Sequence, residues 1–332
     1  MRSLGTAHYR AAVIITDRRA WLNQLVMIRG TSLSVSWKRM LVATVTATAV
    51  TLAQVYFEVF DTNLTPLPFT LIGLALSIFL GFRNTTSYDR FWEGRKLWGR
   101  MVNVSRSFTR QLLTLIGPQA QTSTRAPAPE EVAELARVRR ELVYGQIAYV
   151  HAFRQHLRGQ HDPDEYLNLL PDALAGTLEA ELNRPLAISQ WLGDRLRALY
   201  DRGWVHPLHL SVLEGSLTEI TAVQGACERI KSTPIPYSYT VLMHRIVAVY
   251  CLGLPFGIVS TVGMLTPVVV AIVAYAFYGL DAVGTEIEDP FGTDPNDLPL
   301  STLSRMIEIN LRQRLGEGEL PPVLEPVDGI LQ

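Results

Sequence analysis

The chain has 332 residues, 48% of them hydrophobic and 18% charged, and its 30 basic and 31 acidic residues leave a net charge of −1. A typical soluble domain carries roughly 25% charged residues. The balance of charge excludes a broad basic surface, so we expect no nucleic-acid partner. The shortage of charge is confined to particular windows, which favours membrane segments.

The first 110 residues predict an arm followed by two membrane helices. We expect residues 1–37 to form a cytosolic N-terminal arm near the membrane surface. The uncharged window from about Met40 to Phe57 is just long enough to span a bilayer. A second uncharged window ends at Phe82 and continues into a segment rich in arginine and aromatic residues. We therefore expect residues 38–110 to hold membrane helices 1 and 2, with a cytosolic extension of helix 2.

The second window carries two ridges with helical spacing. Large apolar side chains recur every four residues: Leu74, Ile78 and Phe82. Small residues recur beside them: Gly73, Ser77 and Gly81. The small ridge suits close approach of a neighbouring helix. The large ridge must face a core, lipid or a pore, and periodicity alone favours a core.

The middle of the chain predicts a soluble helical block. Residues 111–232 show helical periodicity and no strand-like alternation, with a flexible Gly- and Pro-containing loop at 117–129. The expected helices occupy residues 130–158, 164–182, 186–201 and 208–231. We expect this block to be cytosolic.

The last third returns to the membrane. Residues 246–280 hold no Asp, Glu, Lys or Arg, which suits two short spans rather than one. We expect membrane helices 3 and 4 within residues 233–281, joined by a turn at 261–267. Residues 282–315 then predict a cytosolic acidic loop and a C-terminal helix, and residues 316–332 a disordered tail. The distribution of Lys and Arg places both termini in the cytoplasm.

The chemistry of the residues favours a pore over an enzyme. The sequence has no HExxH, P-loop, GxSxG or GxGxxG motif, so we do not expect an enzyme. The expected spans hold no ionisable residue of the kind that couples a transporter. A pore is most simply built by ringing several copies around an axis. Apolar side chains facing that axis could gate by expelling water.

Three blocks, in this order, resemble the signature blocks of bestrophins in their bacterial form: LGFRNTTSYDRFWEGRKLWG (80–99), TPIPYSYTVLMHR (233–245) and IEDPFGTDPNDLPL (287–300). The resemblance covers roughly residues 1–110 and 205–315. It implies an all-α membrane protein, a funnel-like homopentamer with four membrane helices per subunit and a cytosolic helical bundle. It also implies a multi-pass protein of the bacterial inner membrane, with membrane lipid, permeant ions and its own copies as partners.

The resemblance assigns roles to particular residues. It implies a narrow neck at Leu74, Ile78 and Phe82 and a second, cytosolic aperture at Ile235. Arg83, just below the neck, would favour anions there, unless it snorkels or pairs with Asp89.

Calcium is where the sequence departs from animal bestrophins. Those relatives bind Ca²⁺ at an acidic run after PFG, and the run here is incomplete: Asp294 and Asp297 remain, with Glu286 nearby. A Ca²⁺ site needs about six to eight oxygens, so no cofactor is certain and Ca²⁺ stays an option. The alternative is a helix-capping turn that joins neighbouring subunits.

Function is expected to be conduction of small monovalent ions. Animal relatives pass chloride and other anions, which favours an anion channel, whereas some bacterial relatives resemble cation channels. The alternatives are a non-conducting membrane scaffold whose cytosolic helices bind a partner, and a small-solute transporter.

Overall fold

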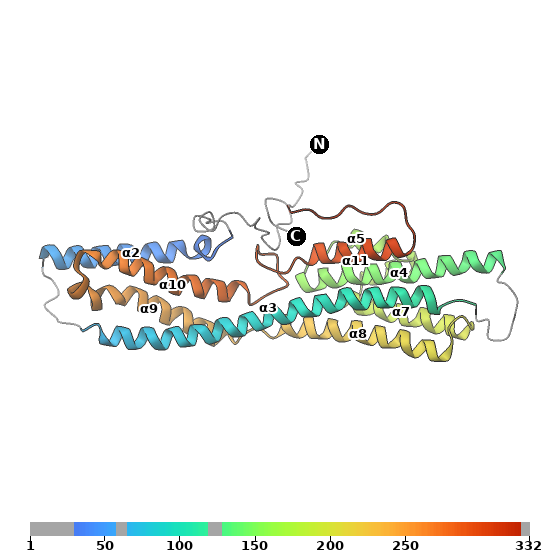
Figure 1. Ribbon diagram of the computed structural model, residues 1–332, viewed down its shortest axis with the longest axis horizontal. Coiled ribbons are helices and arrows are strands. Elements are labelled where there is room, and N and C mark those ends of the chain that lie inside the picture. The colour runs from blue at the N-terminus through green and yellow to red at the C-terminus, as the bar shows by residue number, and fades with distance from the viewer. Residues whose placement is uncertain (1–29, 58–64, 119–127, 327–332) are drawn as a thin grey trace, which may run out of the picture. The chain divides into compact units, whose positions relative to one another are not determined.

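The computed structural model describes residues 30–57, 65–118 and 128–326. Most of the predicted arm, the centre of the predicted loop at 117–129 and the end of the tail lie outside these residues. Within them the regular elements are helices, with one isolated bridge between Ile116 and Val205. For the described residues, the prediction of an all-helical chain is confirmed (Figure 1). The longer helices are α2 (Ser32–Phe57), α3 (Leu67–Leu115), α4 (Pro129–Arg158), α7 (Arg184–Asp201), α8 (Pro207–Ser232), α9 (Tyr237–Val262), α10 (Thr266–Glu286) and α11 (Leu300–Arg314).

The chain divides into two compact units. The hydrophobic unit consists of the described residues up to Trp92 together with Thr233–Pro290. The polar unit consists of Glu93–Ser232 and the described residues from Phe291 onward. Helix α3 contributes its first part to the hydrophobic unit and its second part to the polar unit. It ends at Leu115, just before Gly117 and Pro118, where the sequence predicts a break.

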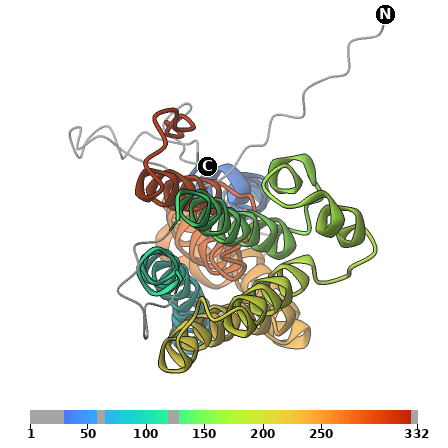
Figure 2. The same ribbon diagram turned by 90° about the vertical axis from the view of Figure 1, so that its right-hand side faces the viewer.

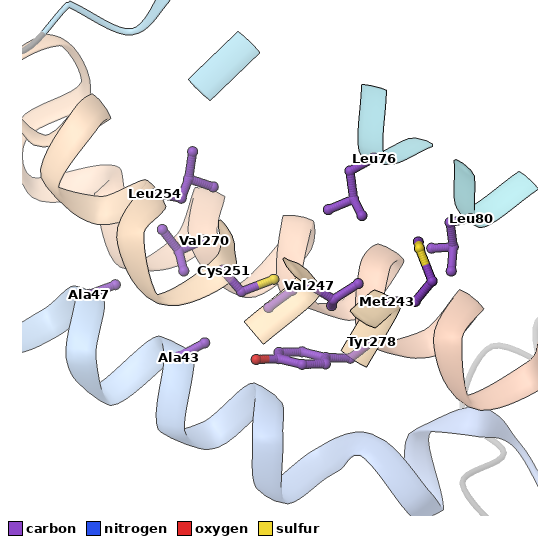
Figure 3. Packing of buried hydrophobic residues seen from close by; sticks show 11 residues of the cluster. Ala43, Ala47, Leu76, Leu80, Met243, Val247, Cys251, Leu254, Val270 and Tyr278 are labelled. Atoms are coloured by element: carbon purple, nitrogen blue, oxygen red, sulfur yellow. The ribbon is translucent and has the colours of Figure 1, made fainter. Parts of the chain in front are cut away.

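The core of the hydrophobic unit joins α2, α9, α10 and the first part of α3. Figure 3 shows Ala43 and Ala47 of α2 facing Val270 and Tyr278 of α10, with Leu76 and Leu80 of α3 above α9. The alanines are fully buried, and α2 packs chiefly against α10. Small side chains at this contact allow the two helix backbones to approach closely.

Three helical stretches of the described chain are long and apolar enough to cross a membrane: Ser32–Phe57, Leu67–Leu115 and Tyr237–Glu286. The third contains two helices, α9 and α10, separated by a single 3₁₀ turn at Gly263–Leu265. Gly263 has a φ of 61°, in the left-handed region that favours glycine. Helices α9 and α10 pack against each other, so the chain reverses at the turn that the sequence predicts.

The polar unit is built around α4, which packs against α7, α8 and α11. Figure 2 views these helices from the end, with α11 (red) lying against α4 (green). In the interior, the rings of Trp98 and Phe153 stack with centroids 5.5 Å apart. Gly145 of α4 lies so close to α7 that an added Cβ would be 2.5 Å from the Trp191 ring.

Two predictions for the polar unit differ from the structure. The single helix expected at 164–182 is wrong, because the structure has two short helices there, α5 (Asp164–Leu167) and α6 (Asp172–Leu178). Pro171 between them lacks the N–H that a continuing helix requires. The tail expected to be disordered from residue 316 is described as far as residue 326, and Glu317 accepts a 2.7 Å hydrogen bond from Tyr144.

Candidate functional site

Helix α3 has two opposite faces in the hydrophobic unit. Leu76 and Leu80 face inward and are 2% and 0% exposed. The ridge of Leu74, Ile78 and Phe82 is 61%, 51% and 63% exposed. Because successive helical residues are rotated by about 100°, this ridge points away from the inward face.

The exposure of the ridge decides one alternative that periodicity leaves open. A stripe that packed inside the subunit's own core would be buried, and this one is not. A contiguous apolar surface marks contact with lipid, with another protein copy or with a narrow pore from which water is expelled. The ridge is therefore available for contacts outside the subunit.

The small residues beside the ridge have different surroundings. Gly73 is buried, and an added Cβ would lie 2.5 Å from the Tyr250 hydroxyl on α9. Gly81 is exposed, with no heavy atom within 4 Å of where its Cβ would be. Ser77 is also exposed, and its hydroxyl donates a 2.8 Å hydrogen bond to the Gly73 carbonyl. Of these three residues, Gly73 is the one that closely contacts another helix of the subunit, and the helix-packing role of Ser77 and Gly81 stays a prediction.

Directly after the ridge, α3 buries an arginine. The Arg83 side chain is 0% exposed, and its Nη1 lies 2.6 Å from Asp281 Oδ1 on α10. Its Nη2 donates a 2.8 Å hydrogen bond to Thr285 Oγ1. The partner of Arg83 is therefore Asp281 and not Asp89, which the sequence offers as one alternative. The guanidinium is committed to α10, and within one subunit it is not presented to a passing ion.

Asp281 connects all four helical segments of the hydrophobic unit. Besides Arg83 of α3, its carboxylate lies 3.5 Å from Arg39 Nη1 of α2 and 3.3 Å from His244 Nε2 of α9. It is 1% exposed. A buried carboxylate is tolerated only when it is paired in this way. The cluster therefore fixes α2, α3, α9 and α10 relative to one another just beyond Phe82.

Sequence reasoning missed this cluster. The charge-free window 246–280 ends at Leu280, one residue before Asp281. The sequence did offer one signal, because an acidic residue, Asp281, directly follows a long apolar run. Its partners come from three distant segments, so their pairing could not be found from spacing.

The loop before α9 holds Ile235 in a defined place. Arg90 donates to the Thr233 carbonyl at 2.5 Å and to the Glu288 carbonyl at 3.0 Å. The Ile235 backbone N–H donates to Glu288 Oε1 at 3.1 Å. Ile235 itself is partly exposed. Arg90 and Glu288 thus anchor the segment in which the second constriction is expected.

The residues considered for calcium do not form a metal site. Among the described residues, no group of three or more His, Cys, Asp and Glu side chains is placed to hold a metal ion. Asp297 Oδ2 accepts a 2.7 Å hydrogen bond from the Asp294 backbone N–H, and the Asp297 N–H donates to the Asp294 carbonyl. These two acids therefore close a turn before α11, whose N-cap residue is Pro299 and has no side-chain cap. With Glu286 they do not fit the oxygen-rich shell that Ca²⁺ requires.

The comparisons with known proteins agree on one family. A family model described as bacterial and fungal bestrophin protein matches residues 13–313. A voltage-dependent anion channel-forming protein of Ralstonia nicotianae is 39% identical over 308 residues, which cover 93% of this chain and 96% of that protein. A protein of the same description from Escherichia coli K12 is 35% identical over 320 residues, covering 95% and 98%. The crystal structure of a bacterial bestrophin homologue from Klebsiella pneumoniae aligns with a TM-score of 0.77 at 31% identity, covering 85% of this chain and 99% of that one.

Proposed function

Because this chain belongs to the bacterial and fungal bestrophin family, we propose that it forms an anion channel in a bacterial cell membrane. Relatives that match nearly its whole length are described as forming voltage-dependent anion channels. The subunits assemble as a homopentamer in the inner membrane, with four spans each and both termini in the cytoplasm. Small monovalent ions cross along the axis of the ring.

The observation that carries the proposal is the outward-facing ridge on α3. Its three large side chains follow one another at one-turn spacing and are exposed in the subunit. When copies of α3 surround an axis, Leu74, Ile78 and Phe82 form three stacked apolar rings. Such a neck opens and closes by wetting and dewetting, without moving a charge.

The rest of the hydrophobic unit suits a lipid environment. Large apolar side chains are exposed on the other three helices as well, among them Val45, Val249 and Ile272. In contact with lipid, these apolar surfaces carry no free-energy penalty, whereas in water they would drive aggregation. The exposed Ser77 and Gly81 are then free to receive a neighbouring copy of α3.

Anion preference rests on the described activity of the relatives and not on a free charge at the neck. The ridge itself is uncharged, and Arg83 is paired with Asp281. The positive edges of the Phe82 rings can tolerate a passing anion. Ile235 forms a second constriction, which Arg90 and Glu288 hold in place.

Planar-bilayer recording of the purified protein tests the proposal. Ile78→Ala and Phe82→Ala should raise the conductance or the open probability, because each widens an apolar ring. Phe79→Ala is the matched control, since Phe79 is 54% exposed on the same helix but lies off the ridge. Unchanged currents in both ridge variants would contradict the neck.

The sign of the reversal potential in a KCl gradient separates anion from cation conduction. A potential near that of chloride supports the proposal, and a potential near that of potassium assigns a cation channel. Saturable solute uptake would indicate a transporter. No ion flux in liposomes, together with a monomer in detergent, would indicate a scaffold.

A further inference from the structure

A basic cavity lies in the polar unit, between the end of α4, the loop into α5 and the start of α11. Its volume is about 200 Å³. Helix α4 ends at Arg158, and its C-cap residue Gly159 has a φ of 62°, so the chain turns there into the loop. The Gln155 side chain fixes the loop by donating to the Asp162 carbonyl at 2.8 Å and accepting from the Asp162 N–H at 2.9 Å. These two hydrogen bonds hold the loop against α4, so this part of the cavity wall has a fixed backbone.

Three arginines line this cavity: Arg154 and Arg158 from α4 and Arg305 from α11. Arg154 is 6% exposed. Arg158 uses Nη1 to donate a 2.8 Å hydrogen bond to Ser301 Oγ. Its Nε and Nη2 are buried and have no hydrogen-bond partner among the described residues, and the same holds for Nε of Arg154 and of Arg305. A buried N–H without an acceptor costs roughly 1–3 kcal/mol, and more on a charged group.

Two of the nearby acids, Glu165 and Glu308, are already committed to other groups. Glu165 pairs with Arg154, accepts a 2.7 Å hydrogen bond from Gln155 and lies 3.5 Å from His151 Nδ1. Glu308, which lies 3.4 Å from Arg305 Nη1, is shared with Arg312 at 2.7 Å and with His151 at 3.0 Å. Neither of these two carboxylates bonds to Arg158. Asp162 also lines the cavity, so its wall holds three arginines against two acids, Asp162 and Glu165.

The electrostatics of Arg158 agree with this geometry. Burial lowers the pKa of Arg158 to about 10, and the neighbouring positive charge of Arg154 lowers it further, against the opposing effect of Asp297 and Glu165. An arginine in this condition is stabilised by any anion that reaches its free N–H groups.

We propose that this cavity binds a small oxyanion of the phosphate class, as inorganic phosphate or as the phosphate group of a small metabolite. Arginine N–H groups arranged as a fork match the oxygens of a phosphate, and three converging arginines supply more donors than a halide can use. The volume lies below the range of about 300–1,000 Å³ for drug-sized ligands, which suits a phosphate group. The cavity belongs to the polar unit alone, so the proposal does not depend on ion conduction.

Calorimetric titration of the full-length protein in detergent with orthophosphate tests the proposal. We expect saturable binding, and Arg158→Gln and Arg305→Gln should each weaken it about tenfold to a hundredfold, as loss of a charge-assisted hydrogen bond does. Arg197→Gln is the control. It removes the same charge from an exposed pair with Asp201 on α7 and should leave the affinity unchanged.

Parallel titrations identify the ligand class. Binding of orthophosphate alone assigns the site to free phosphate, whereas equal or tighter binding of glycerol phosphate assigns it to a phosphate monoester. Equal competition by chloride overturns the oxyanion class. The proposal also fails if the wild-type protein shows no saturable binding in the millimolar range, or if both cavity variants bind as it does.

If the variants do not fold, locating the bound anion directly in the wild-type protein tests the proposal instead. A cryo-electron-microscopy map of the wild-type protein with tungstate should show added density beside Arg158 and Arg305. Density only at other places would overturn the proposal.

Discussion

The two units bury similar polar groups but expose opposite surfaces. The hydrophobic unit buries the pair of Arg83 and Asp281, and the polar unit buries His151 between Glu165 and Glu308. The hydrophobic unit exposes large apolar side chains on all four of its helical segments, whereas the polar unit places Trp98, Phe153 and similar residues inside. Buried polar contacts to carboxylates are therefore common to both, and the outer surface is what differs.

That difference shows which surroundings each unit is built for. In the polar unit, burial of apolar surface away from water supplies the main driving force. In the hydrophobic unit much apolar surface stays outside, so tight packing and buried polar contacts must hold the helices together. Loss of one internal contact should therefore strongly lower the stability of the hydrophobic unit. Substitutions on its outer face should alter function more than stability.

The largest expected effect is at Asp281. Asp281→Asn removes the carboxylate that lies 2.6 Å from the buried Arg83 and leaves Glu288, at 3.9 Å, as its remaining acidic partner. The change should lower the free energy of unfolding by about 3–5 kcal/mol, measured by denaturant titration of the purified protein. The control is Glu219→Gln in the polar unit, where Glu219 pairs with Arg100, whose side chain is 59% exposed. That change should cost no more than about 1 kcal/mol. Equal stability of Asp281→Asn and the wild-type protein would contradict a structural role for the cluster.

A smaller effect separates the two faces of α3. Leu80→Ala, at a fully buried position, should lower the free energy of unfolding by about 2 kcal/mol or more through lost packing. Leu74→Ala removes the same atoms from a position that is 61% exposed, so the subunit's own stability should barely change. Paired measurements of unfolding and of single-channel current check this contrast. A Leu74→Ala protein as destabilised as Leu80→Ala would place the ridge in the core after all.

The smallest expected effect is acid sensitivity in the polar unit. Burial alone would raise the pKa of Glu308, but the hydrogen bond from His151 and the charges of His151, Arg305 and Arg312 outweigh it, so the pKa lies below 4.5. The same balance, with His151 and Arg154, lowers the pKa of Glu165. A carboxyl whose pKa is lower in the folded state stabilises the fold above its unfolded pKa, and this contribution is lost as the pH falls through the folded pKa.

Thermal unfolding as a function of pH checks this expectation. Glu308→Gln should cost about 1–2 kcal/mol at neutral pH, and the difference from wild type should shrink as the pH drops below about 4.5. The exposed Glu181→Gln provides a control that should follow the wild-type curve. A Glu308→Gln difference that stays constant across this pH range would show that its carboxylate does not contribute in this way.

Local sequence signals were sufficient for most of the helices. Gly117 and Pro118 mark the end of α3, and the uncharged window at 246–280 predicts the pair of helices with a glycine turn at Gly263. These features depend on neighbouring residues, because backbone conformation and charge-free length are properties of short segments. The single helix expected at 164–182 failed because Pro171 interrupts it.

The order of the three sequence blocks and the charge-poor windows by themselves determined the family and the all-helical class. Periodicity determined that Leu74, Ile78 and Phe82 share one face of a helix. Only the tertiary structure decided that this face points away from the subunit's core and that Arg83 pairs with Asp281, 198 residues away. Which side of a helix is buried, and which charge meets which, depends on the distant segments that pack against it. Spacing along one segment holds no information about those partners.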